Sequence, residues 1–158
     1  MKRTVYGVVG GAALAAGLLA GPAQAAGPAI QHFTAPAVYT LSPADTGCTF
    51  DIAVNGVDNV VIQTFANKVV VHDDFSGTES ANGVTLLSSE HATITDDLVT
   101  GTQTWVGQPL RVSLPNGGTV TLDAGKLVYN PDGSIAVQHG PHPFADGNVA
   151  EYCAAFTP

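Results

Sequence analysis

The sequence predicts an all-β fold, an antiparallel meander that closes into a β-barrel of the lipocalin-like or a related type. Residues 110–143 carry the clearest signal, because apolar and polar residues alternate there with the period of two that a strand requires. Three breaks separate these runs and supply proline or glycine, which tight turns favour: Pro115-Asn116-Gly117-Gly118, Ala124-Gly125 and Pro131-Asp132-Gly133. Closure into a barrel removes the unpaired edges of such a meander. A β-sandwich is the alternative architecture.

The chain begins with a predicted signal peptide, residues 1–25. Lys2 and Arg3 precede an apolar run, and Ala23-Gln24-Ala25 is a small-residue cleavage motif. The apolar run, residues 5–20, is shorter than the roughly 20 residues that a membrane-spanning helix needs, so a cleaved leader is favoured over an anchor. We therefore expect cleavage after Ala25, secretion of the mature chain and no membrane insertion afterwards.

The charge balance excludes two classes of partner. Without the leader, only Lys68, Arg111 and Lys126 stand against thirteen acidic residues. Nucleic acids and anionic lipid surfaces require clustered positive charge, which three scattered cations do not provide. A small apolar ligand or an extracellular protein is the kind of partner that remains.

The two cysteines, Cys48 and Cys153, are expected to form a disulfide, because a secreted chain with one widely spaced pair usually oxidises it. For a loop of about 100 residues, the chain-entropy argument predicts a stabilisation of roughly 4–5 kcal/mol. A metal pair or a reactive thiol would require a nearby third ligand or a basic residue, and the sequence shows neither.

Residues 26–46 are expected to be an extended segment without regular structure, because Pro28, Pro36 and Pro43 interrupt it. Residues 47–158 form the expected single domain. Before the meander, strands are predicted at residues 47–54, 59–65, 68–72, 84–88, 91–95 and 98–106, some of which are expected to merge. Asn55-Gly56 predicts a turn between the first two, and the polar residues 73–82 predict a loop.

The period changes near the end of the sequence. Val149, Tyr152, Cys153 and Phe156 recur at helical spacing, and Asn148 precedes them as a candidate N-cap. We expect a short helix whose buried face carries Cys153, so that the disulfide ties this helix to the first strand of the domain.

Four segments of the C-terminal third form a recognisable series: Asp123-Ala124-Gly125-Lys126-Leu127-Val128-Tyr129, Pro131-Asp132-Gly133, Gly140-Pro141-His142-Pro143 and Tyr152-Cys153-Ala154-Ala155. The series resembles a group of small secreted proteins from actinobacteria that carry a signal peptide and a single cysteine pair. The strand around Cys48 is similar in kind, whereas residues 55–107 do not match residue by residue. The resemblance implies an extracellular location and a fold class, and it implies no mechanism.

Familiar catalytic motifs are absent from the sequence, including the G-x-S-x-G elbow, H-E-x-x-H and the phosphate-binding loops. We therefore predict no catalytic residues and no cofactor. His139, His142 and Asp146 are residue types that bind zinc or copper, but a strand end followed by a proline-ordered turn explains them more simply, and no metal site is predicted. Asp73-Asp74 and Asp96-Asp97 are interpreted as solvated charges, because neighbours on a strand face opposite ways.

Trp105, Gln103, Gln63 and His139 are the candidate ligand-binding residues. Trp105 and Gln103 share one face of a predicted strand, where an apolar ring beside an amide would suit a cavity wall. Gln63 lies between apolar neighbours, and His139 continues a face that we expect to point into the barrel mouth. Ordinary core packing is the competing explanation for each of them.

Three functions are compatible with such a barrel. A cavity lined by these four residues favours a non-enzymatic binding module for a small apolar or amphipathic ligand, or a barrel enzyme of the cyclase or isomerase type. An interior filled by Val, Leu and Ile favours an extracellular or cell-surface protein-interaction module. The ligand-binding module is the leading hypothesis, and it rests on architecture alone.

Overall fold

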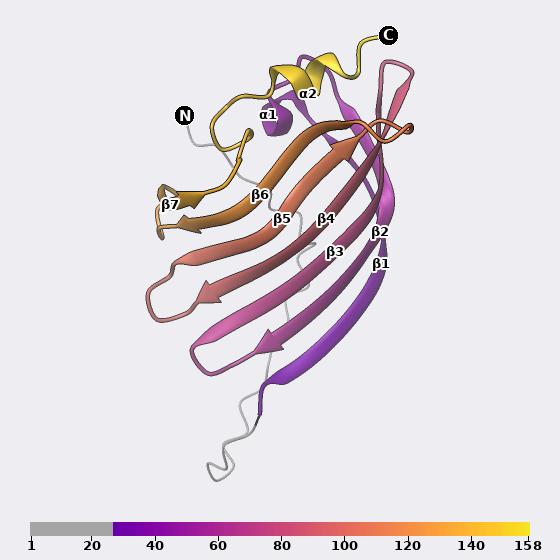
Figure 1. Ribbon diagram of the computed structural model, residues 1–158. Helices are drawn as coiled ribbons and strands as arrows, with labels where there is room; N and C mark the ends of the chain where they lie inside the picture. Colours follow the sequence, from indigo (N-terminus) through magenta and orange to yellow (C-terminus); the bar gives the residue numbers. More distant parts are fainter. Residues whose placement is uncertain (1–26) are drawn as a thin grey trace.

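The computed structural model describes residues 27–158, which form one open and strongly curved sheet with two short helices at one end (Figure 1). The elements are β1 (Ala29–Leu41), α1 (Pro43–Thr46), β2 (Ile52–Thr64), β3 (Lys68–Ala81), β4 (Val84–Asp97), β5 (Gln103–Ser113), β6 (Thr119–Tyr129), β7 (Ile135–His139) and α2 (Ala150–Ala154). All seven strands are antiparallel neighbours in chain order. The predicted all-β class and antiparallel meander are confirmed. The predicted signal peptide, residues 1–25, lies outside the described residues.

The predicted closure into a barrel is not found. β1 and β7 each pair on one side only, so they remain the two edges of the described sheet. β7 has five residues and β1 has thirteen, so little of β1 could pair with β7 even if the edges met. No helix in the described part of the chain is long and apolar enough to cross a membrane.

The prediction of an irregular N-terminal segment is wrong for residues 29–41, which form β1. This strand pairs with β2 along its whole length, from Ala29 opposite Thr64 to Leu41 opposite Ile52. Pro36 is compatible with the strand because β1 is an edge, and an edge tolerates a proline where its missing N–H would point to solvent.

The predicted turn at Asn55-Gly56 and most of the predicted loop at residues 73–82 are strand. Gly56 of β2 lies opposite Gly77 of β3, and the ring of Phe75 lies against both. A Cβ built on Gly56 would come within 2.5 Å of the Phe75 ring, and one on Gly77 within 2.7 Å. These glycines therefore make room for an aromatic ring inside a continuous sheet and do not mark a turn.

Alternation gives the sheet two faces. We define the inner face by Ile52, Leu86 and Val112, which are fully buried in the main core cluster, and the outer face by the intervening residues. Tyr152 and Phe156, in and just after α2, complete that cluster. Because both helices lie at one end of the sheet (Figure 1), the main core occupies that end only.

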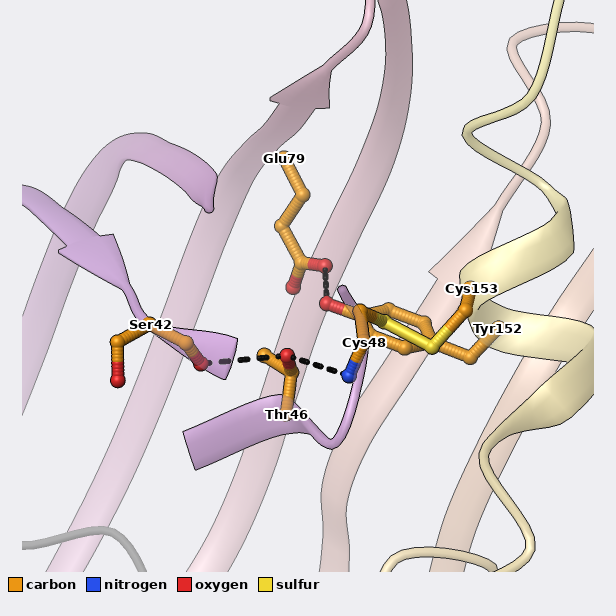
Figure 2. The surroundings of a disulfide bond; sticks show 6 residues. All are labelled: Ser42, Thr46, Cys48, Glu79, Tyr152 and Cys153. Carbon is orange, nitrogen blue, oxygen red and sulfur yellow. Dashed lines mark hydrogen bonds between the residues drawn. A yellow bond between two sulfur atoms is a disulfide. The ribbon is translucent and has the colours of Figure 1, made fainter. Parts of the chain in front are cut away.

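The predicted disulfide between Cys48 and Cys153 is present. Cys153 lies in α2, as expected, whereas Cys48 lies in the segment between α1 and β2 and not in a strand. Beside it, the Tyr152 hydroxyl donates a 2.6 Å hydrogen bond to Glu79, and the Cys48 backbone N–H donates to the Thr46 hydroxyl (Figure 2). The helix prediction is confirmed, but the predicted cap is not found: α2 begins after Val149, and no side chain caps it.

Candidate functional site

The end of the inner face far from the helices carries aromatic and apolar side chains that no helix covers in the described chain. We call this region the open half. Its members are Phe33, Val60, Ile62, Val71, Asp73, Ala92, Ile94, Gln103, Trp105, Leu127 and Tyr129, which share a face through direct pairing across the strands. Leu127 and Tyr129 are buried, whereas Trp105 is only partly buried.

Hydrogen bonds fix the orientation of Trp105 within the open half. Its indole N–H donates to the side-chain oxygen of Gln103 at 2.6 Å, and the Gln103 amide donates to Asp96 at 2.7 Å. Ile94 and Leu127 are the direct cross-strand neighbours of Trp105. Three strands thus hold one partly buried aromatic ring in a defined position, with its indole N–H satisfied.

A band of carboxylates separates the open half from the core. Asp58, Phe75 and Glu90 are paired across β2, β3 and β4, and Asp73 lies in the adjacent inner-face row. Burial, with added repulsion from neighbouring carboxylates, raises the pKa of Asp73 to about 6 and that of Glu90 to about 8. One carboxylate oxygen of Asp73 is buried and has no hydrogen-bond partner in the described chain.

The inner face of the described strands carries no lysine or arginine to balance these acids. The lysines and arginines of the described chain are Lys68, Arg111 and Lys126, and each precedes an inner-face residue in its strand, so all three lie on the outer face. The negative field extends as far as β1, where burial and then the charge of Asp58 raise the pKa of Tyr39 to about 12. The inner face is therefore acidic and the cations lie behind it.

The structure brings together two of the four candidate ligand-binding residues and separates the other two. Trp105 and Gln103 lie together on the inner face, as predicted. Gln63 pairs with Ile30 and Val70 on the outer face, because it follows the inner-face residue Ile62. His139 pairs with Lys126 on the outer face. The expectation that Gln63 and His139 line the same interior wall is therefore wrong.

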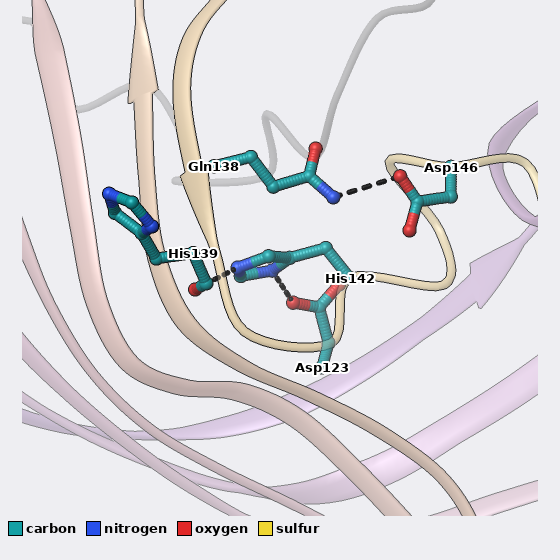
Figure 3. Close-up of polar contacts among 5 residues, drawn as sticks. All are labelled: Asp123, Gln138, His139, His142 and Asp146. Atoms are coloured by element: carbon teal, nitrogen blue, oxygen red, sulfur yellow. Dashed lines mark hydrogen bonds and ion pairs between the residues drawn. The ribbon is translucent and has the colours of Figure 1, made fainter.

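The alternative metal site at His139, His142 and Asp146 is also not formed. The two nitrogens of the His142 ring are occupied: Nε2 donates to the backbone carbonyl of His139 at 3.0 Å and Nδ1 contacts Asp123 at 2.5 Å (Figure 3). The ring of His139 points away from His142, and Asp146 accepts a hydrogen bond from Gln138. Within the described residues, no group of three or more His, Cys, Asp or Glu side chains could hold a metal ion.

The buried His142 lies where two segments of the C-terminal series meet in this chain. Asp123 binds its ring, the Ala124 N–H donates to the carbonyl of Pro141 at 2.9 Å, and a Cβ on Gly125 would lie 2.0 Å from the carbonyl of His139. The Asp-Ala-Gly segment of β6 is thus the surface on which the Gly-Pro-His-Pro segment lies. These two segments therefore hold each other in place, and both ring nitrogens of His142 are already used.

Sequence reasoning missed Asp58 and Glu90, and it interpreted Asp73 as a loop charge. Their common face depends on the register between β2, β3 and β4, which places Asp58 opposite Phe75 and Phe75 opposite Glu90. A usable signal was present within β4, where Glu90 alternates with Leu86, Ser88, Ala92 and Ile94 on the buried side.

Comparison of the chain with protein-family models, with curated proteins and with solved structures finds no match.

Proposed function

We propose that this protein is a non-enzymatic binding protein whose ligand lies against the open half and is amphipathic, with an apolar part and a positive charge. One observation carries the proposal: an inner face that combines an oriented Trp105 with buried carboxylates and has no lysine or arginine of the described chain. Trp105, Ile94 and Leu127 offer apolar contact, and Glu90 and Asp73 lie in the neighbouring rows.

Electrostatics favours a cation over a neutral or an anionic ligand. Asp58, Asp73 and Glu90 repel one another, which contributes to the raised pKa values of Asp73 and Glu90. A cationic group placed among them stabilises their charged forms, and aromatic rings attract cations across their faces. Binding of such a ligand offsets part of the cost of holding buried carboxylates together.

The proposal does not depend on whether the sheet is closed. If a further strand paired with the edges, the open half would become the interior of a barrel with the same lining. An extracellular location, in which the disulfide is stable, belongs to the same proposal, as does the origin implied by the sequence resemblance.

Trp105 makes a direct binding test possible, because it is the single tryptophan of the chain. Octyltrimethylammonium, octanoate and octyl glucoside share one alkyl chain and differ in head-group charge. Titration of each below its micelle concentration, followed by Trp105 fluorescence and checked by calorimetry, should give saturable binding of the cation and much weaker binding of the other two. Equal affinity for all three, or no binding of the cation, contradicts the proposal.

Two neutral variants locate the charge effect. At about pH 9, where both carboxyl groups are charged, Asp73→Asn and Glu90→Gln should each weaken binding of the cation by about three- to tenfold, the size expected for loss of one partly screened charge contact. Asp74→Asn removes the same charge from the next residue, which lies on the outer face, and should leave the affinity unchanged. A similar loss in all three variants would indicate a non-specific effect of net charge.

A further inference from the structure

β1 presents a long unpaired backbone edge. It has thirteen residues, pairs with β2 on one side, and has no described strand on the other. Alternate residues of an edge strand point their N–H and C=O groups away from the sheet, where another strand can pair with them. The pairing of β1 with β2 contains no bulge, so this outward row of backbone groups is regular.

The side chains of β1 leave the edge accessible. The first eight residues are all exposed, and the exposed fractions of the apolar side chains reach 54% for Ile30, 49% for Phe33 and 72% for Val38. Edge strands are usually protected by charged residues, bulges or short length. β7 follows that rule, with five residues and an irregular register, whereas β1 is long and carries Pro36 as its one protective feature.

Charge identifies which surface of this acidic protein can meet a copy of itself. β1 contains no Asp, Glu, Lys or Arg, whereas each of the strands β2 to β6 contains charged residues. Two copies of a chain with formal net charge −8 repel each other. An uncharged, self-similar edge is where that repulsion is smallest and where backbone hydrogen bonds are available.

We infer that β1 pairs antiparallel with β1 of a second copy of this chain and makes a two-fold symmetric dimer. Pro36 lacks a backbone N–H, so the intermolecular hydrogen bonds are made by the outward-pointing residues two positions away on each side, Thr34 and Val38. A two-fold axis perpendicular to the sheet keeps the two inner faces on the same side of one continuous sheet.

The dimer changes the surroundings of the open half. β1 runs from the open end of the sheet at Ala29 to the helix-covered end at Leu41. Antiparallel pairing therefore places the open half of one copy beside the helix-covered end of the other. Phe33 and Tyr39, exposed along this margin of the inner face, lie at the junction. The dimer is independent of the ligand proposed above, since its contacts are on the edge.

Analytical ultracentrifugation of the secreted protein tests the inference. We expect a monomer–dimer equilibrium at micromolar concentration, with no larger species because the dimer leaves only the short β7 edges unpaired. Val38→Glu places a charge on the exposed edge and should shift the protein to monomer. Val106→Glu is the matched control, because Val106 is also exposed on the outer face but belongs to the interior strand β5, and it should leave the equilibrium unchanged.

Cysteine cross-linking gives a second test, which reports where two copies touch and does not require a substitution that weakens the dimer. Cys48 and Cys153 are joined to each other, so an introduced cysteine is the single free thiol. In a register centred on Pro36, position 34 of one copy lies opposite position 38 of the other, so a mixture of the Thr34→Cys and Val38→Cys proteins should yield mixed disulfide-linked dimers under mild oxidation. A mixture of the Thr34→Cys and Val106→Cys proteins should not. A monomer at all accessible concentrations, equal dimerisation of Val38→Glu and wild type, or open-ended oligomers would each overturn the inference.

Discussion

Asp73 and Asp74 are adjacent and chemically identical, but they lie on opposite faces of β3. Asp74 hydrogen-bonds His91 on the outer face, where both side chains are exposed. Asp73 lies on the inner face, where burial raises its pKa to about 6 and one of its oxygens has no partner in the described chain. The side of the pleat therefore decides whether a carboxylate is an ordinary surface charge or part of the candidate site.

The raised carboxyl pKa values predict the direction of the pH dependence of stability. A carboxyl with a higher pKa in the folded chain binds its proton more tightly when folded, so its stabilising contribution is complete at low pH and is lost as pH rises through the folded value. With Asp73 at about 6 and Glu90 at about 8, the free energy of unfolding should fall between about pH 4.5 and 8. Asp97 and Asp132, whose pKa values hydrogen bonds lower, act in the opposite direction below this window.

Glu90→Gln tests this assignment, because glutamine stays neutral at every pH. Thermal melting at about pH 5 and about pH 8.5 should show a smaller difference for the variant than for the wild type, with the variant the more stable protein at the higher pH. Asp51→Asn, which removes an exposed carboxylate, serves as the control and should retain the wild-type difference. A wild-type protein more stable at pH 8.5 than at pH 5 contradicts the prediction.

Gly56→Ala should destabilise the protein although the residue lies in a strand. The added methyl group would meet the Phe75 ring and the Ser76 carbonyl oxygen at 2.5 Å, and the backbone atom cannot move without disturbing the β2–β3 ladder. We expect a loss of about 1–3 kcal/mol, the usual effect of overpacking, measured by urea unfolding. Gly27→Ala, where no atom lies within 4 Å of the added group, should cause almost no change.

At the scale of elements, α2 is held to the sheet by a buried hydrogen bond as well as by packing. Glu79 of β3 accepts hydrogen bonds from Tyr152 of α2 and from Ser88 of β4. Burial raises the pKa of Glu79, and these two hydrogen bonds act against that rise. The helix is short, so its position depends on these contacts and on the disulfide more than on its own helical stability.

Tyr152→Phe should weaken this attachment while keeping the aromatic contacts with Phe144 and Phe156. Loss of one donor to a buried carboxylate is expected to lower the free energy of unfolding by about 1–3 kcal/mol, measured by chemical denaturation near neutral pH. Tyr129→Phe removes a hydroxyl for which the described chain offers no partner, and its stability should stay close to that of the wild type. Equal effects of the two substitutions would argue against a specific role for the Glu79 contact.

The sequence predicted elements where the local pattern was sufficient. Residues 110–143 alternate clearly, and the structure has strands there with turns at two of the predicted breaks, residues 115–118 and 131–133. The third predicted break, Ala124-Gly125, is wrong, because it lies inside β6. Pro36 and Gly56 misled the prediction because their effects depend on neighbours: an edge accommodates the proline, and Phe75 on the next strand requires the glycine. Only part of the candidate site could be predicted from the sequence. Trp105 and Gln103 belong to one strand, so its alternation places them on one face. Asp58 and Glu90 come to the same face only through the pairing of β2, β3 and β4.

For the whole molecule, one open sheet with a core at one end places much of the stability in that end. The disulfide between Cys48 and Cys153 spans 105 residues and links the segment before β2 to the segment after β7. Replacement of both cysteines by serine should lower the free energy of unfolding by about 4 kcal/mol on the chain-entropy argument. Urea unfolding of the wild type with and without a reductant should reproduce that difference, and an unchanged midpoint contradicts it.

The leader prediction is tested by the mass of the secreted chain. Cleavage after Ala25 should give the mass of residues 26–158 less two hydrogens for the disulfide, and treatment with a reductant should restore the two hydrogens. A retained leader, or cleavage at another position, contradicts the predicted site.

The position of the disulfide also has a consequence for the order of events when the chain is made. Synthesis delivers the N-terminal part first, so Cys48 emerges while its partner is still 105 residues away. Until Cys153 arrives, Cys48 is a free thiol on an incomplete sheet, open to reaction with another nascent chain. Oxidation too early therefore traps intermolecular products, and the yield of native protein should depend on an oxidase that acts late or on an isomerase that corrects early errors.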